Sequence, residues 1–126
     1  MPVAEHWQDD PEEHDFPAAA DYLSLVAPAG DVAKVVDALR AAETRHRKAK
    51  DLLRAGRLGL LPPDNVHVMK DLEKVAAGTR LSPVLLLRGR GDKGMPLTVA
   101  DGYHRICASH HLDEDADVPC RLIAWP

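Results

Sequence analysis

One segment organises this chain around it: Leu97-Thr98-Val99-Ala100-Asp101-Gly102-Tyr103-His104-Arg105-Ile106-Cys107-Ala108. Residues 97–100 are short, apolar and partly β-branched, which predicts a buried strand. Asp101 and Gly102 break that strand, and residues 103–112 then favour a helix. A strand, a glycine turn and a helix in this order leave the first backbone N–H groups of the helix without partners.

The turn therefore predicts an anion site. Free N–H groups and the positive end of the helix dipole attract phosphate. Gly102 has no side chain to keep an anion from the backbone. Arg105, and His104 when protonated, could add charge-assisted hydrogen bonds. The alternative is an ordinary Asp-Gly turn, in which Asp101 only caps the helix and no ligand binds.

The segment Asp101-Gly102-Tyr103-His104-Arg105 resembles the strand–turn–helix loop of the ParB/sulfiredoxin superfamily. ParB-type domains carry a glycine followed by basic residues there, and sulfiredoxins carry glycine, cysteine, histidine and arginine. The helical stretch 66–77 before Gly78, the strand 83–88 and the closing stretch 118–123 resemble the family's other elements, in the same order. The resemblance covers about half the chain and suggests a bacterial branch of the superfamily.

The resemblance implies an α+β fold, with a small mixed β-sheet, helices and an N-terminal helical extension. It also implies a nucleotide-phosphate site, with Gly102, His104 and Arg105 at the matching positions and Tyr103 between them. Tyr103 stands where sulfiredoxins have their catalytic cysteine, so we expect no sulfinic acid reduction. No helix-turn-helix segment follows the domain, so we expect no centromere partitioning and no DNA binding.

Several functions stay open on this basis, because a fold does not fix a function. The leading one is binding of a nucleotide or another phosphate, with a nucleoside triphosphate and Mg²⁺ as the candidate ligand. The second is a metal-dependent phosphotransferase or a nuclease or phosphodiesterase, with Asp101 or His104 as acid–base catalyst. The third is a protein-interaction module that keeps the loop without binding phosphate. The sequence indicates neither the pathway nor the oligomeric state.

The composition, with 126 residues, 45% hydrophobic and 29% charged, is typical of a soluble globular domain. No apolar run reaches membrane-spanning length and the acidic N-terminus is no signal peptide, so we expect a cytoplasmic protein without membrane contact. Cys107 and Cys120 are expected to be free thiols. His104, Cys107 and His111 share a helical face, but a rise of about 10 Å between the two histidines rules out one shared zinc.

We expect three parts: an acidic N-terminal arm over 1–17, a helical extension over 18–57, and the ParB/sulfiredoxin-like domain over 58–126. The arm is either a mobile tail or packed on the surface, with Trp7 and Phe16 as the candidate anchors. The extension should hold a helix over 18–26, a second capped by Asp31 and a third from Thr44 to about Arg54. On the third, a basic face would carry Arg47, Lys50 and Arg54. That face is either solvated or a surface for phosphate or an acidic partner.

The last part should begin with a short strand over 58–61 and a helix capped by Asp64. The uninterrupted apolar run 84–87 predicts a central strand. A glycine-containing turn should connect it to the strand at 97–100. The chain should close with a strand over 120–124, after which Trp125 covers an edge of the core.

Overall fold

The β-strands form one mixed sheet in the order β1-β4-β2-β3. A computed structural model describes residues 6–126, and its strands are Arg45–Lys48 (β1), Val84–Leu87 (β2), Thr98–Asp101 (β3) and Asp117–Ile123 (β4). β4 lies parallel to β2, whereas the pairs β1–β4 and β2–β3 are antiparallel. The predicted α+β class with a small mixed sheet is confirmed.

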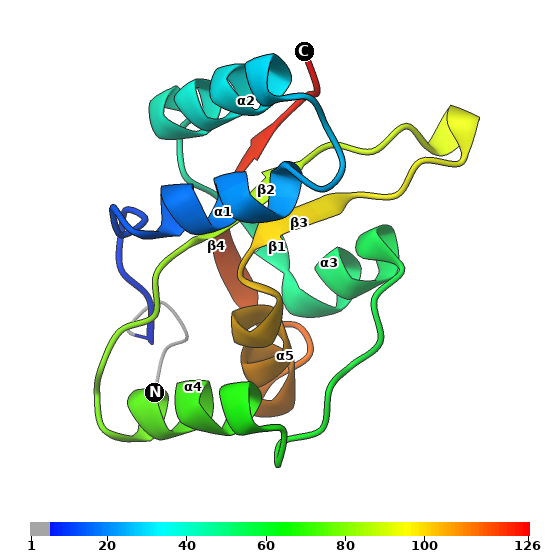
Figure 1. Cartoon of the computed structure of the whole chain (residues 1–126). Helices are drawn as coiled ribbons and strands as arrows, with labels where there is room; N and C mark the ends of the chain where they lie inside the picture. Colours follow the sequence, from blue (N-terminus) through cyan, green and yellow to red (C-terminus); the bar gives the residue numbers. More distant parts are fainter. Residues whose placement is uncertain (1–5) are drawn as a thin grey trace.

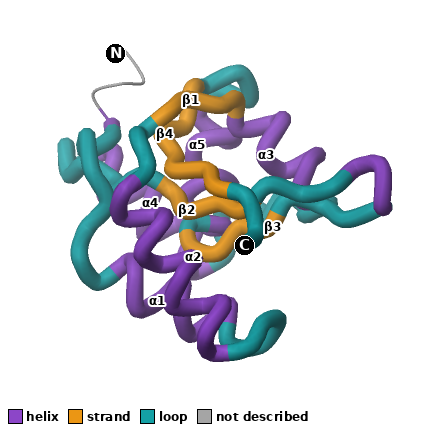
Figure 2. Tube along the Cα trace, turned by 90° about the horizontal axis from the view of Figure 1, so that it is seen from above, coloured by secondary structure: helices purple, strands orange, loops and turns teal. Residues whose placement is uncertain are grey.

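Helices cover both faces of this sheet (Figures 1 and 2). Their bounds are Asp15–Leu23 (α1), Ala29–Ala41 (α2), Ala49–Gly56 (α3), Val66–Ala76 (α4) and Tyr103–Leu112 (α5). α1 and α2 pack on one face, whereas α3 and α5 pack on the other and α4 lies against α5. A short 3₁₀ turn, Gly91–Lys93, forms the tip of the hairpin between β2 and β3.

Strand β2 is buried on both faces, as its apolar run predicts. Successive side chains of a strand point to opposite faces. Val84 and Leu86 accordingly join the core cluster under α3 and α5, whereas Leu85 and Leu87 join the cluster under α1 and α2. One four-residue strand thus supplies both cores, and the sheet is held from both sides.

The predicted strand–turn–helix around Gly102 is also confirmed, although the strand includes Asp101 and, apart from the buried Ala100, is only partly buried. β3 ends at Asp101, Gly102 has a φ of +114°, and α5 begins at Tyr103. A φ in this region is reached readily only by glycine. The turn lets the chain leave the sheet edge and fold back over the face that carries α3.

Of the two alternatives for the N-terminal arm, the structure shows the packed one for residues 6–17, whereas residues 1–5 lie outside the described part of the chain. Trp7 is buried and forms a parallel bridge with Leu81, and Phe16 is buried inside the first turn of α1. α1 begins at Asp15 rather than at residue 18, because the ring of Pro17 is tolerated in the first turn of a helix.

The helix predicted from Thr44 is wrong at its beginning. Residues Arg45–Lys48 form β1, an edge strand whose side chains are all exposed, and α3 starts only at Ala49. The segment has no apolar alternation, so its sequence does not show a strand. Backbone pairing with β4, from Arg45 opposite Cys120 to Lys48 opposite Asp117, decides its conformation. The predicted helical extension therefore contributes a strand to the sheet.

Three further local predictions are wrong. Residues 58–61 form no strand; they run as a loop whose leucines Leu58 and Leu61 pack against the core. α2 begins at Ala29 after Pro28, so Asp31 lies inside its first turn instead of capping it. Asn65, and not Asp64, caps α4 by accepting hydrogen bonds from the backbone of the first turn. At the other end of the chain, Trp125 packs against the second core cluster, as predicted.

Candidate functional site

A cavity of about 360 Å³ lies beside the N-terminal end of α5. The arm around Gln8, the start of α1, helix α4, the loop 79–82 and the turn between β3 and α5 form its walls. Four predicted site residues are therefore brought together at one cavity, namely Asp101, Gly102, His104 and Arg105. We call this space the α5 cavity.

The backbone at the beginning of α5 presents unpaired donors. The first helical hydrogen bond runs from the N–H of Ile106 to the carbonyl of Gly102, at 3.0 Å. The N–H groups of residues 103–105 precede that bond, and none has an acceptor within the described chain. Such N–H groups donate hydrogen bonds to water or to a ligand.

Gly102 turns out to serve packing. A Cβ added there would lie 2.3 Å from Cγ1 of Val84 and 3.1 Å from Nη2 of Arg105. We expected the missing side chain to give an anion access to the backbone. The structure shows that the space is filled by the first residue of β2.

Arg105 is held inside the fold. Its Nη2 donates to Oδ2 of Asp101 at 2.9 Å and to the carbonyl of Pro83 at 3.3 Å. The two side chains of this ion pair are only 16% and 18% exposed. Nε of Arg105 is buried and has no acceptor within the described chain. Arg105 therefore links the turn to the beginning of β2, and much of its charge is balanced by Asp101.

Burial dominates the titration of Asp101. It raises the pKa of the carboxyl above its usual value, and the neighbouring Arg105 guanidinium opposes that rise. A carboxylate that is engaged in an ion pair with a buried arginine is poorly placed to take up a proton from a substrate. Among the two candidate catalysts, Asp101 is thus the less available one.

His104 stands next to His67, with ring centroids 4.6 Å apart. Burial and the neighbouring His67 lower the pKa of His104, so its ring is neutral at neutral pH. A neutral imidazole adds no positive charge to a phosphate site, but it can accept a proton. Asp71 lies in the same wall of the cavity, and burial raises the pKa of its carboxyl.

The side chain of Tyr103 points away from the α5 cavity toward the loop 58–61, although its ring centroid lies 5.6 Å from that of His104. Its hydroxyl donates to the carbonyl of Gly59 in the loop before α4, and its ring packs against the core under α3 and α5. The loop 58–61 is thereby fixed to α5. Tyr103 itself does not line the α5 cavity.

Sequence reasoning missed the cations of the opposite wall. Lys70 and Lys74 on α4, and Arg80 in the following loop, line the α5 cavity. A signal was available, because His67, Lys70 and Lys74 recur at helical spacing and must share a face. Nothing in the local pattern indicates that this face meets the turn at Gly102, more than 20 residues further along the chain.

The predicted basic face of Arg47, Lys50 and Arg54 does not form. Arg47 belongs to strand β1, so it does not follow the helical periodicity of α3. Lys50 is engaged with Asp115 of the acidic loop, Nζ to Oδ1 at 2.5 Å. Arg47 and Arg54 instead line a different cavity, between α3 and the hairpin.

We expect Arg105→Ala to destabilise the fold by about 1–3 kcal/mol at neutral pH, because it leaves the half-buried carboxylate of Asp101 unpaired. Without the arginine the folded-state pKa of Asp101 rises further above its unfolded value. The folded state then binds more protons than the unfolded state, so stability returns as the pH falls. Urea unfolding at about pH 7.5 and about pH 5 measures the free energy of unfolding. The difference between Arg105→Ala and the unmodified protein should be smaller at the lower pH.

The double variant Asp101→Asn/Arg105→Ala is the control for this expectation. Asparagine has no charge to leave unpaired, so the double variant should show no such dependence on pH beyond that of the unmodified protein. If Arg105→Ala lowers the free energy of unfolding by the same amount at both pH values, the ion pair with Asp101 does not account for the lost stability.

Comparison with protein-family models, with curated protein sequences and with solved structures gives no match to this chain. Within residues 6–126 no three histidine, cysteine or acidic side chains are arranged to hold a metal ion. No helix in that part of the chain has the length and apolar character needed to cross a bilayer. Both cysteines are free and buried, as expected. The function must therefore be inferred from the α5 cavity itself.

Proposed function

We propose that the α5 cavity binds the phosphate of a nucleotide or of a similar small ligand, as the resemblance to the ParB/sulfiredoxin superfamily implies. The observation that carries the proposal is the unpaired N–H groups of His104 and Arg105, two residues that line the cavity together with Lys70, Lys74 and Arg80. Helix N-termini bind anions through such donors, and charged donors strengthen the bonds. A volume of about 360 Å³ suits a small ligand.

The cations that are available for a phosphate are those of α4 and its following loop. Arg105 is balanced by Asp101, and His104 is neutral at neutral pH. Lys74 lies 3.9 Å from Asp71 and is only loosely paired. Lys70 and Arg80 have no ion pair within the described chain, so we assign them the main contact with the phosphate charge.

Carboxylates line the cavity as well, which favours a phosphate that carries a divalent cation. Glu12, Asp15, Asp71 and Asp101 border the same space, and they would repel a bare polyphosphate. Mg²⁺ is commonly held by substrate phosphates together with one or two carboxylates, without a complete protein cage. Asp71, whose partner Lys74 is distant, is the residue we assign to such an ion. This supports a nucleoside triphosphate with Mg²⁺ as the ligand.

The proposal is tested with a pair of neighbouring variants on α4, Lys70→Gln and Asp71→Asn. Calorimetric titration with inorganic phosphate and with nucleoside mono-, di- and triphosphates, with and without Mg²⁺, measures the affinities. Lys70→Gln should weaken binding about tenfold, because it removes a charge-assisted hydrogen bond. Asp71→Asn should strengthen binding several-fold without Mg²⁺ and abolish the gain that Mg²⁺ gives.

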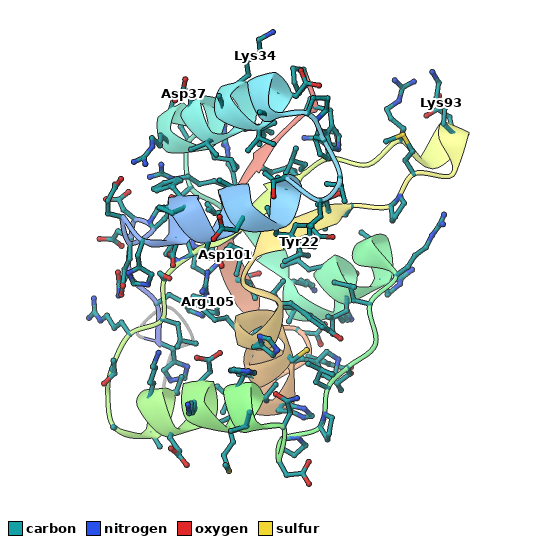
Figure 3. All side chains as sticks on the ribbon, in the orientation of Figure 1. Tyr22, Lys34, Asp37, Lys93, Asp101 and Arg105 are labelled. Carbon is teal, nitrogen blue, oxygen red and sulfur yellow. The ribbon has the colours of Figure 1, made fainter. Side chains whose placement is uncertain are left out.

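Lys34→Gln is the matched control, since Lys34 lies on α2, far from Asp101 and Arg105 (Figure 3). It changes the net charge as Lys70→Gln does. If the two variants weaken the affinity for phosphate equally, the effect comes from the net charge of the protein and not from a contact of Lys70. Absence of binding by every phosphate compound would contradict the proposal. Loss of the terminal phosphate during the titration would assign the enzymatic alternative, with His104 as the candidate base.

A further inference from the structure

A second cavity, of about 490 Å³, lies between α3 and the hairpin that joins β2 to β3. We call it the arginine groove, because four arginines line it, namely Arg47, Arg54, Arg57 and Arg88. Its floor is apolar and includes Leu52, Leu86, Leu97 and Leu122. The hairpin projects from the sheet beyond α3 (Figure 1), so the groove lies on the opposite side of the molecule from the arm.

The walls of the arginine groove are held in place by backbone contacts. The N–H of Leu97 donates to the carbonyl of Ala55 at 2.9 Å, which ties the end of α3 to the beginning of β3. Arg90 and Met95 exchange two backbone hydrogen bonds across the hairpin. A Cβ on Gly89 would lie 2.4 Å from the carbonyl oxygen of Met95, so the two arms of the hairpin approach as closely as glycine allows. The groove is therefore preformed.

The charge of the groove is opposite to that of the chain as a whole. The chain has a formal net charge of −4, yet Asp51 is the only acidic residue beside the four arginines among the described residues that line the groove. Asp51 meets Arg54 at 3.4 Å on the exposed surface, where such a pair contributes little. Arg57 and Arg88 form no ion pair within the described chain, and Arg47 donates to the carbonyl of its neighbour His46. Most of the guanidinium groups are available to an acceptor from another molecule.

The floor shows what kind of anion fits. None of the described residues that line the groove is aromatic, so bases of a nucleic acid would find no stacking platform. Met95 and Pro96 are exposed at the floor's edge beside Leu97, and a methionine thioether adapts to apolar side chains of varied shape. Carboxylates pair with guanidinium groups in bidentate geometry. The combination matches a peptide with acidic and apolar side chains.

We propose that the arginine groove binds an acidic segment of another polypeptide. Carboxylates of this segment pair with Arg54 and Arg88 from the two walls, and an apolar side chain between them lies on Leu97 and Met95. This interaction is independent of phosphate binding, because none of these residues borders the α5 cavity. The protein would then combine a small-ligand site and a docking surface at different ends of one sheet.

Fluorescence anisotropy with a short labelled peptide of alternating glutamates and leucines tests the proposal on the full chain. Binding should weaken as salt is added. The double variant Arg54→Gln/Arg88→Gln should weaken binding about three- to tenfold, since it removes two exposed charge pairs. Its matched control is Arg45→Gln/Arg90→Gln, which removes the same charge outside the groove from arginines paired with Glu43 and Asp92. This control should bind within about twofold of the unmodified protein.

Comparison ligands separate the alternatives. A peptide with glutamine in place of glutamate, and one with serine in place of leucine, should each bind more weakly if both charge and floor contribute. Equal weakening by the two double variants would overturn the proposal, as would absence of binding. Tighter binding of a single-stranded oligonucleotide than of the peptide would overturn it too, and would assign the groove to nucleic acid.

Discussion

Gly102→Ala is expected to lower the free energy of unfolding by about 2–5 kcal/mol, a large part of the stability of a domain of this size. Two costs add. An alanine at a φ of +114° is strained, at about 1–2 kcal/mol. Its Cβ would also fall 2.3 Å from Cγ1 of Val84, so the first residue of β2 would have to move. Overpacking of a buried site costs about 1–3 kcal/mol. Urea unfolding followed by circular dichroism measures the sum.

Gly78→Ala separates the two costs. Gly78 also has a positive φ, of +81°, but a Cβ there meets nothing within 4 Å. It should therefore cost only about 1–2 kcal/mol. The free-energy loss of the double variant Val84→Ala/Gly102→Ala should be smaller than the sum of the losses of its single variants. The reason is that Val84→Ala removes Cγ1, the closer of the two contacts of the new methyl with Val84, and leaves only Cβ of residue 84 at 2.7 Å. If Gly102→Ala lowers the free energy of unfolding no more than Gly78→Ala does, the contact of the new methyl with Val84 does not destabilise the fold.

The strand–turn–helix was predictable because its determinants are local. The apolar residues 97–100, the turn at Gly102 and the helical pattern behind it lie within one short segment. The same holds for β2, whose four apolar residues have no polar interruption. β1 could not be predicted, because Arg45–Lys48 carries only charged or polar side chains. The segment becomes a strand through pairing with β4, from Arg45 opposite Cys120 to Lys48 opposite Asp117, far along the chain.

The site was predictable only in part for a related reason. The free N–H groups follow from the helix start and are local. Arg105, however, has two possible partners, an incoming anion and the carboxylate four residues before it. Asp101 ends β3 and Arg105 lies in the first turn of α5, so the rule that favours ion pairs four residues apart on one helix does not apply to them. That Asp101 is buried enough to retain the arginine depends on tertiary packing, as does the approach of Lys70 and Arg80 from α4 and its following loop.

Trp7→Ala should lower the free energy of unfolding by about 3–5 kcal/mol, the range observed for large aromatic side chains removed from a core. Trp7 is only 3% exposed and belongs to the core cluster under α3 and α5. Two backbone hydrogen bonds beside it tie the arm to the loop after α4: Gln8 donates to the carbonyl of Leu81 at 2.7 Å, and Leu81 donates to the carbonyl of His6 at 2.8 Å. Loss of the indole removes the apolar contact that holds these bonds in place.

The consequence reaches the α5 cavity, because Gln8 and Glu12 of the arm form part of its wall. Hydrogen exchange at the amides of Gln8 and Leu81 should therefore accelerate more than exchange in β2 when Trp7 is replaced, since a local opening precedes global unfolding. Trp7→Phe should retain part of the stability, and Tyr22→Ala, at a side chain 44% exposed, should cost little. If Trp7→Ala and Tyr22→Ala unfold at the same urea concentration, the arm is not anchored by its tryptophan. If Trp7→Ala is destabilised but exchange at Leu81 follows that of β2, the arm unfolds only together with the whole domain, and the cavity wall is as stable as the sheet.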